Sequence, residues 1–260
     1  MGVRGLTIGV VALALSVSVV VAWSSPAGAA EGYVRMQVRT SFPPRKLPQL
    51  KATPASLDVT VNATTADGLT PAPLTRLAFD LDSDIALAVK GLPRCRVPGR
   101  GPQRSLEEFK EICGPAVIGG GRLRAAITFP GNDPIPALSP LLIINAEDPD
   151  GGASLYALAQ LVQPISTSIV MPVAIEKGHG PFGQRLILEV PKIANGAGSI
   201  DLLELSFPRR VAVGGADGIV HLRCADAGIA VRARATFLDG SLALADNRRP
   251  CRYRQPPSAH

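Results

Sequence analysis

Turn-forming residues interrupt this chain at short intervals, and that spacing limits its fold more than any other feature of the sequence. The 260 residues include 26 Gly and 24 Pro, so 50 positions, about a fifth, disfavour a regular helix. Pairs such as Asp67-Gly68, Asn195-Gly196 and Asp239-Gly240 are typical of tight turns between strands. A helical bundle or coiled coil needs long runs of good helix formers, so these classes are excluded.

The segments between the turns alternate between apolar and polar residues, as half-buried strands do. In residues 57–62, for example, Leu57, Val59 and Val61 share one face, and the polar residues share the other. The same pattern or a short apolar run predicts strands at 33–39, 77–81, 123–129, 140–146, 154–162, 168–176, 184–190, 199–207, 218–224 and 230–238. About a dozen short strands with regular turns predict an all-β fold, a β-sandwich of antiparallel strands.

One segment predicts a helix instead. Ser105-Leu106-Glu107-Glu108 has the capping-box pattern, with Ser105 as the N-cap and Glu108 three residues later. The helix should run from Leu106 to Ile112 and end at Cys113-Gly114-Pro115, since Gly and Pro terminate helices. A helix of about two turns is marginal alone, so we expect it to need support from the rest of the fold.

The first 30 residues have the organisation of a secretory signal peptide. Arg4 supplies the positive charge, residues 6–22 are almost wholly apolar, and Ala27-Gly28-Ala29 fits the cleavage rule, so residues 1–30 are predicted to be removed. An uncleaved membrane anchor is the rival interpretation, because 17 apolar residues approach the length of a spanning helix. No later stretch is long and apolar enough to span a membrane. We therefore expect a secreted protein, extracellular or in the cell envelope.

The four cysteines all follow the predicted signal and are even in number, which in an oxidising compartment favours two disulfides. Of the three possible pairings we favour Cys95–Cys113 with Cys224–Cys251, because each closes a short loop within one region. The first loop would contain the predicted helix. Zinc ligands typically come in pairs separated by two to four residues, and these spacings are far longer, so a zinc site is the weaker alternative.

The mature chain divides into two parts by composition. Residues 31–56 hold an N-terminal strand followed by a Pro-rich basic segment that contains Arg45, Lys46 and Lys51. Residues 57–254 show no composition break and no internal repeat, which favours a single β-sandwich domain over residues 57–260.

Signatures of common secreted hydrolases are missing from the sequence. There is no G-x-S-x-G elbow and no H-E-x-x-H helix. The weak catalytic candidate is His179, which lies in a glycine-rich loop between two expected strands, where binding residues are often found. A hydrolase with an unrecognised site, pairing His179 with Asp148 or Asp150, is therefore the alternative to a non-enzymatic protein.

Asp80, Asp82 and Asp84 have the spacing that opens a calcium-binding loop and are weak calcium candidates. Ile85 stands where the loop requires Gly, and Gly91 stands where it requires Glu, so an EF-hand is excluded. Gly119-Gly120-Gly121 leads into a strand and lacks the phosphate-loop pattern, which favours a bulge or tight bend. No cofactor is predicted.

The chain is basic, with 27 Lys and Arg against 21 Asp and Glu, a net charge of +6. Basic residues gather in residues 90–124 and again in the tail, at Arg248, Arg249, Arg252 and Arg254. Such surfaces attract anionic envelope polymers or another envelope protein with salt-sensitive affinity. Nucleic acid is not expected as a partner, because it is less plausible outside the cell and the basic residues lack the interleaving of aromatic residues that base stacking needs.

Three features together resemble uncharacterised secreted β-rich proteins of actinobacterial type. They are the signal ending Ala27-Gly28-Ala29-Ala30, the segment 91–95 (Gly-Leu-Pro-Arg-Cys) followed by a short helix to Cys113, and the segment 180–186 (Gly-Pro-Phe-Gly-Gln-Arg-Leu). The resemblance covers most of residues 33–254. It implies an exported β-rich domain and transfers no activity and no catalytic residue. The sequence thus predicts a non-enzymatic binding or structural module of the cell envelope or extracellular space.

Overall fold

The structure is a computed structural model of the chain, and it describes Gly2 and residues 34–96, 104–147, 155–164, 166–211 and 217–253. The expected signal peptide therefore lies outside the described residues, apart from Gly2. Asp148 and Asp150, the carboxylates proposed as partners of His179, also lie outside them. Across the described residues, no helix has the length and hydrophobicity needed to cross a membrane.

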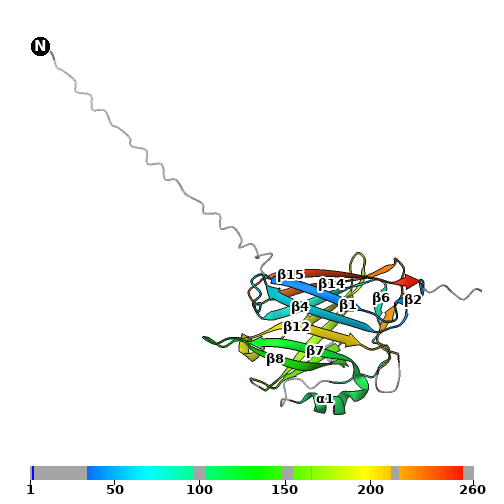
Figure 1. Cartoon of the computed structure of the whole chain (residues 1–260), viewed down its shortest axis with the longest axis horizontal. Coiled ribbons are helices and arrows are strands. Elements are labelled where there is room, and N and C mark those ends of the chain that lie inside the picture. The colour runs from blue at the N-terminus through cyan, green and yellow to red at the C-terminus, as the bar shows by residue number, and fades with distance from the viewer. Residues whose placement is uncertain are drawn as a thin grey trace, which may run out of the picture.

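Eleven antiparallel strands form one large sheet that wraps around a single core (Figure 1). In spatial order they are β1 (Val34–Ser41), β4 (Leu57–Thr65), β12 (Gly198–Phe207), β7 (Val117–Ile127), β8 (Ile135–Asn145), β9 (Leu155–Leu161), β10 (Thr167–Lys177), β11 (Phe182–Glu189), β5 (Leu74–Asp82), β14 (Gly228–Phe237) and β15 (Leu242–Pro250). The predicted all-β class and antiparallel pairing are confirmed. The two layers of the expected sandwich are opposite sides of one continuous sheet.

The two edges of this sheet meet, so β1 and β15 lie side by side (Figure 1). Every neighbouring pair in the sheet is antiparallel, and the number of strands is odd, so the first and last strands must run in the same direction. Thr40 and Asn247, each near the end of its strand, are joined across this boundary by a hydrogen bond of 2.6 Å from Oγ1 to Oδ1. We call this parallel boundary between β1 and β15 the seam.

Beyond its last residues the seam is extended by a small parallel sheet of β2 (Lys46–Leu47) and β16 (Arg252–Tyr253). A disulfide joins Cys224 to Cys251, directly before β16, and the Cys224 amide donates to the Pro48 carbonyl at 2.9 Å. A third sheet is formed by β3 (Thr53–Pro54), β13 (Val220–Leu222) and β6 (Ile85–Leu87). It lies in the same region of the fold, because β3 follows β2 closely and β13 directly precedes Cys224. These contacts fix residues 45–54 against the C-terminal strands.

The core is built by the alternation that the sequence shows. In β4, Leu57, Val59, Val61 and Ala63 are buried, and the intervening side chains are half-exposed. Phe42, which follows β1, lies in the same core cluster. The core is almost entirely apolar, which follows from a sheet whose inner face meets only itself. Residues 34–47 contribute to that core as fully as the strands after residue 57 do.

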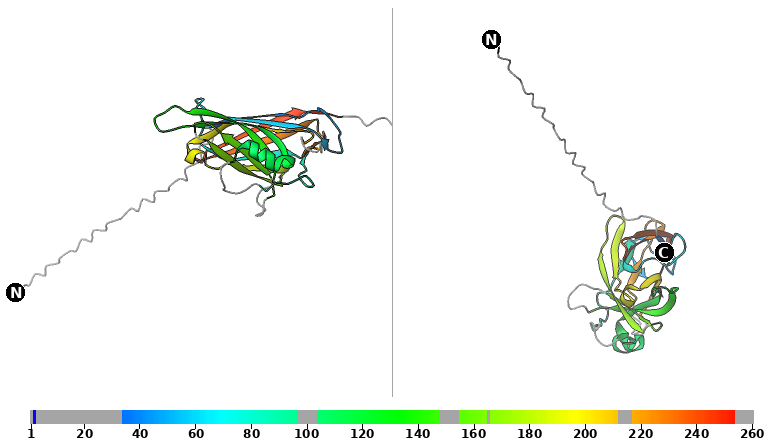
Figure 2. Two further views of the ribbon diagram at one scale, coloured as in Figure 1. Left: turned by 90° about the horizontal axis from the view of Figure 1, so that it is seen from below. Right: turned by 90° about the vertical axis from the view of Figure 1, so that its left-hand side faces the viewer.

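The helix α1 (Leu106–Cys113) packs on the outside of the sheet (Figure 2). Its capping box is as predicted, because the Glu108 amide donates to the Ser105 hydroxyl at 3.2 Å and the Ser105 amide donates to the Glu108 carboxylate at 2.6 Å. The buried side chains of the helix form a second cluster with Leu142, Ile144 and Leu158 of β8 and β9. The predicted disulfide Cys95–Cys113 closes the loop around the helix and fixes its C-terminal end.

The glycines of β7 allow it to approach β12 closely. The pairing of β7 with β8 shifts register between Val117 and Gly119, so the predicted bulge is present. A Cβ atom at Gly121 would lie 1.8 Å from the carbonyl oxygen of Glu204 in β12, and one at Gly119 would lie 2.7 Å from that of Ser206. Side chains larger than hydrogen therefore do not fit here, which explains glycine in the middle of a strand.

Candidate functional site

Six exposed basic side chains gather along the seam and its extension. We call this group the seam surface; its residues are Arg39, Arg45, Lys46, Arg248, Arg249 and Arg252. Arg39 and Arg248 flank the hydrogen-bonded pair Thr40 and Asn247, so they lie on neighbouring strands. Lys46 and Arg252 are direct register partners in the parallel pair β2 and β16. Cations from the two ends of the described chain thus gather at the seam and its extension, with Arg248 and Arg249, as successive residues of β15, on opposite faces of the sheet.

The backbone beneath the seam surface is held in place by several bonds. The Arg252 amide donates to the Arg45 carbonyl at 2.9 Å, and the Cys251 amide donates to the Ala227 carbonyl at 3.2 Å. The Cys224–Cys251 disulfide fixes the same stretch covalently. Because these residues are already ordered, a ligand would not have to order the backbone when it binds, which favours affinity.

Among the described residues, none of the six side chains of the seam surface takes part in an ion pair. The guanidinium of Arg248 donates only to a backbone carbonyl, that of Asp226, at 3.4 Å. Register places Lys46 directly beside Arg252, so like charges are neighbours. Like charges that lie together without counter-charges create a positive potential that attracts polyanions.

The opposite arrangement extends from the rest of the sheet to the seam itself, where charges alternate in one row across five strands that ends at Asp246 in β15. The row runs through Glu176, Arg185, Asp80, Arg232 and Asp246, which are register neighbours from β10 to β15. Arg185 pairs with the buried Asp80, and Arg232 pairs with Asp246 at 2.7 Å. The Arg232 guanidinium also lies 5.3 Å from the centre of the Phe182 ring. These arginines are neutralised within the fold and are not available to a ligand.

The pKa values of the arginines in this row follow from their partners. The hydrogen bond that the Arg185 guanidinium donates to Asp80 raises the pKa of Arg185, and the charges of Asp80 and Glu176 add to the effect. The hydrogen bond and charge of Asp246 raise the pKa of Arg232, with a further contribution from Asp80. Both side chains therefore stay charged at every pH at which the protein is folded.

Replacing Arg185 by glutamine is expected to lower the free energy of unfolding by about 2 kcal/mol, because the Asp80 carboxylate would stay buried with one partner fewer. Arg232 remains near Asp80, which keeps the loss below that of a fully orphaned charge. The double variant Asp80→Asn/Arg185→Gln should lose less than the sum of the single changes, by about 1 kcal/mol or more. Urea titrations of the four proteins measure this coupling.

The matched control for that cycle is Arg122→Gln. Arg122 pairs with Glu204 at 2.7 Å, but its side chain is 59% exposed, so the pair is screened by water. Its removal should leave the urea midpoint unchanged. If the stability losses of the Asp80 and Arg185 single variants simply added up in the double variant, the interaction between these two buried side chains would be contradicted.

The three weak calcium candidates are engaged by different donors. Asp80 binds Arg185, and Asp82 accepts from the backbone amides of Asp84 and Ala230, each at 3.0 Å. Asp84 accepts from the Arg223 guanidinium at 2.8 Å and from a backbone amide at 2.6 Å. In the part of the chain that the structure describes, no three His, Cys, Asp or Glu side chains group so as to hold a metal ion. The three carboxylates thus act as acceptors for neighbouring strands.

His179 lies at the exposed tip of the hairpin between β10 and β11. Its carbonyl accepts from the Phe182 amide at 3.2 Å, which closes the turn, and Gly178 and Gly183 are bonded across the hairpin at 3.0 Å. No side chain that could act as its acid or base partner contacts it among the residues described. Its glycine-rich surroundings therefore form an ordinary hairpin turn.

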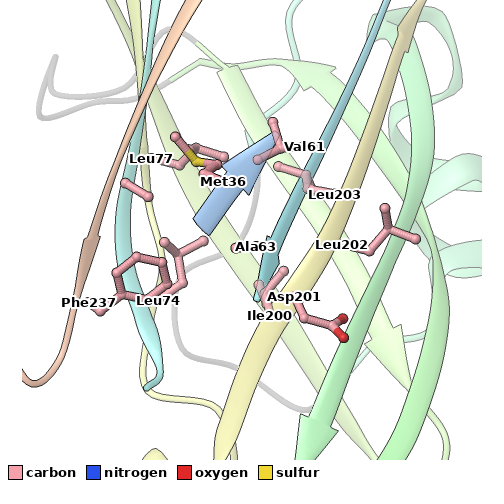
Figure 3. Close-up of a pocket in the computed structure, with 11 residues that line it drawn as sticks. Met36, Val61, Ala63, Leu74, Leu77, Ile200, Asp201, Leu202, Leu203 and Phe237 are labelled. Atoms are coloured by element: carbon pink, nitrogen blue, oxygen red, sulfur yellow. The ribbon is translucent and has the colours of Figure 1, made fainter. Parts of the chain in front are cut away.

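The interior of the sheet holds two small cavities. The first lies between β1, β4 and β12 on one side and β5 and β14 on the other, and Figure 3 shows Met36, Leu77, Leu203 and Phe237 around it. Its volume is about 10 Å³, and the second, beside Phe79, has about 20 Å³. A single water needs about 10–15 Å³, so these are packing gaps of an apolar core and hold no organic ligand.

The sequence did not predict the seam surface. The segment 45–51 and the tail 248–254 were each recognised as basic, but they are about 200 residues apart and only the closure of the sheet brings them together. The basic residues of 90–124, in contrast, are partly neutralised within the fold. Lys110, Arg122 and Arg124 form ion pairs with Glu107, Glu204 and Asp201, respectively. No family model, no curated protein and no solved structure matches this chain.

Proposed function

We propose that the protein is an exported, non-enzymatic module that binds an anionic polymer of the cell envelope through the seam surface. The observation that carries this proposal is the group of six exposed cations, without ion-pair partners in the described chain, on a covalently fixed backbone. The signal-like N-terminus and two disulfides support export, because disulfides persist in oxidising compartments.

The shape of the seam surface favours a linear ligand. The cations are distributed along two parallel strands and their extension, so their charges are spread along the strand direction. An extended polyanion can contact several of them at once, and each contact releases counterions and adds affinity at low salt. Tyr253, 47% exposed, is the one large aromatic side chain beside the seam surface, so stacking of successive bases has little support there.

The proposal is tested by sedimentation with purified bacterial cell walls at low and high salt. The variant Arg248→Gln/Arg249→Gln/Arg252→Gln removes three charges from the seam surface. Exposed charge pairs contribute about 0.5 kcal/mol each, so the three changes should weaken binding roughly tenfold at low salt. The salt dependence of the remaining binding should also become shallower.

The matched control is Arg94→Gln/Arg96→Gln/Lys110→Gln, which changes the net charge by the same amount. These residues lie around α1, tied to it by the Cys95–Cys113 disulfide, on the side of the sheet away from the seam (Figures 1 and 2). Wall binding of this variant should be close to that of the unchanged protein. Equal losses of binding in both variants would show that binding depends on net charge and not on the seam surface. The absence of binding at low salt would contradict the proposal.

A further inference from the structure

A pocket of ligand size opens at the end of the sheet opposite to the β2–β16 extension. Its volume is about 330 Å³, in the range of small-molecule sites and far above that of the two interior cavities. Register places the end of β7 beside the start of β12, and the end of β9 beside the start of β10, at this end of the sheet. The pocket therefore lies between turns that the strands hold close together.

Part of the lining of the pocket is apolar. Ile127 and Leu161 belong to the core and are only 2% exposed, so the accessible apolar surface comes mainly from Phe129, Pro164 and Ala194. An apolar group placed against these three residues would remove their surface from water. This part of the lining therefore suits an alkyl chain or another small hydrocarbon.

The rim of the pocket is polar and carries one charge. Thr167 and Asn195 contribute a hydroxyl and an amide, and Lys192 contributes the only charged side chain of the described lining. Lys192 is exposed and forms no ion pair or side-chain hydrogen bond within the described residues. A cation without a counter-charge beside an apolar hollow matches a ligand with one anionic end.

The turn that carries this rim has an unusual backbone. Ala194 and Asn195 both have positive φ, at 47° and 57°, and the Gly196 amide closes the turn on the Ile193 carbonyl at 2.9 Å. Alanine in the left-handed region costs about 1 kcal/mol, and such strain tends to be kept where it positions functional groups. Here it places Asn195 and Lys192 on the same rim.

We propose that this pocket binds an alkyl carboxylate, with the hydrocarbon chain over Phe129, Pro164 and Ala194 and the carboxylate at Lys192. The carboxylate accepts hydrogen bonds from the ammonium group of Lys192. Its remaining lone pairs can accept from the Thr167 hydroxyl and the Asn195 amide. This site is separate from the seam surface, and its function does not depend on polymer binding.

Isothermal titration calorimetry with octanoate and 1-octanol tests the assignment on the whole protein. Octanoate should bind with one site and a Kd on the order of 0.1–1 mM, as expected for a ligand of its size. Lys192→Met should weaken octanoate binding about fivefold and leave 1-octanol binding unchanged, because only the carboxylate uses the charge. Ser166→Trp, at the rim, should weaken both ligands by occupying the opening.

The matched control is Lys177→Met, which makes the same change at an exposed lysine at the far end of β10 and should bind octanoate normally. Failure of octanoate to bind at millimolar concentration, or equal binding by Lys192→Met, would overturn the proposal. Cell-wall sedimentation of Lys192→Met should be unchanged, so a failure of this pocket is distinguishable from a failure of the seam surface.

Discussion

Replacing Gly121 by alanine is expected to lower the free energy of unfolding by about 3 kcal/mol or more. The new methyl group would lie 1.8 Å from the carbonyl oxygen of Glu204, which is backbone and cannot rotate away. The strands β7 and β12 must then separate, which weakens their ladder and the packing of Leu203 and Leu123 beneath it. Urea unfolding followed by far-UV circular dichroism measures the loss.

Gly114→Ala provides the matched control for this substitution. Gly114 has helical angles, with φ −43° and ψ −50°, and apart from its chain neighbours and its own helix no atom lies within 4 Å of the position of its Cβ. Alanine there should change stability by less than about 1 kcal/mol, because the reduced freedom of the unfolded chain offsets the cost of a Cβ at helical angles before Pro115. A Gly121→Ala protein as stable as the Gly114→Ala protein would show that β7 and β12 are further apart than the structure has them.

Removal of the Cys224–Cys251 disulfide is expected to cost about 3.5 kcal/mol of stability. The two cysteines are 27 residues apart. The cross-link lowers the conformational entropy of the unfolded chain, so removing it stabilises the unfolded state. The double variant Cys224→Ala/Cys251→Ala tests this by thermal and urea unfolding. Because the bond also fixes the backbone of the seam surface, binding to cell walls should weaken in the same variant at temperatures where it is still folded.

The Cys95→Ala/Cys113→Ala variant separates these two effects. Its loop is 18 residues long, so its loss of stability should be similar, at about 3 kcal/mol. Its disulfide fixes α1 and lies away from the seam, so wall binding should persist. Equal loss of wall binding in both variants would show that binding follows overall stability and not the order of the seam.

Local features of the fold could be predicted from the sequence because each depends on neighbouring residues. The alternation in 57–61 corresponds to β4, the capping box at Ser105 begins α1, and both predicted disulfides are present. Their physical causes, which are the period of a strand, the unpaired amides of a helix end and the short loop between two cysteines, act within about 30 residues.

Strand β15 is the clearest omission from the sequence prediction, which has no strand over 242–250. Its inward residues are small, since Ala243 is buried, and the larger Leu244 points outward and is 55% exposed. The usual rule, with large apolar residues inward and polar residues outward, is therefore reversed along this strand. Small inward residues leave room for the side chains of the opposite side of the core, a requirement that arises only once the sheet is closed.

The candidate sites depend on the same long-range closure. The seam surface needs β2 beside β16, and the end pocket needs three turns from residues 127–195 to meet. Neither meeting follows from a local pattern. His179 and the carboxylates at 80–84 attracted attention because their spacing is local, and the structure places His179 at an exposed turn and the carboxylates in bonds to neighbouring strands.

The parallel seam also sets the order in which the chain can complete its fold. The strand β1 is the first to leave the ribosome or a translocation channel, and its outer edge meets β15, which is almost the last. Until β15 lies beside it, the edge of β1 is open to other chains, the condition under which strands aggregate. Contacts between residues so distant in the chain form slowly. A nascent copy of this protein is thus most in need of a chaperone from the moment β1 pairs with β4 until Cys251 reaches Cys224.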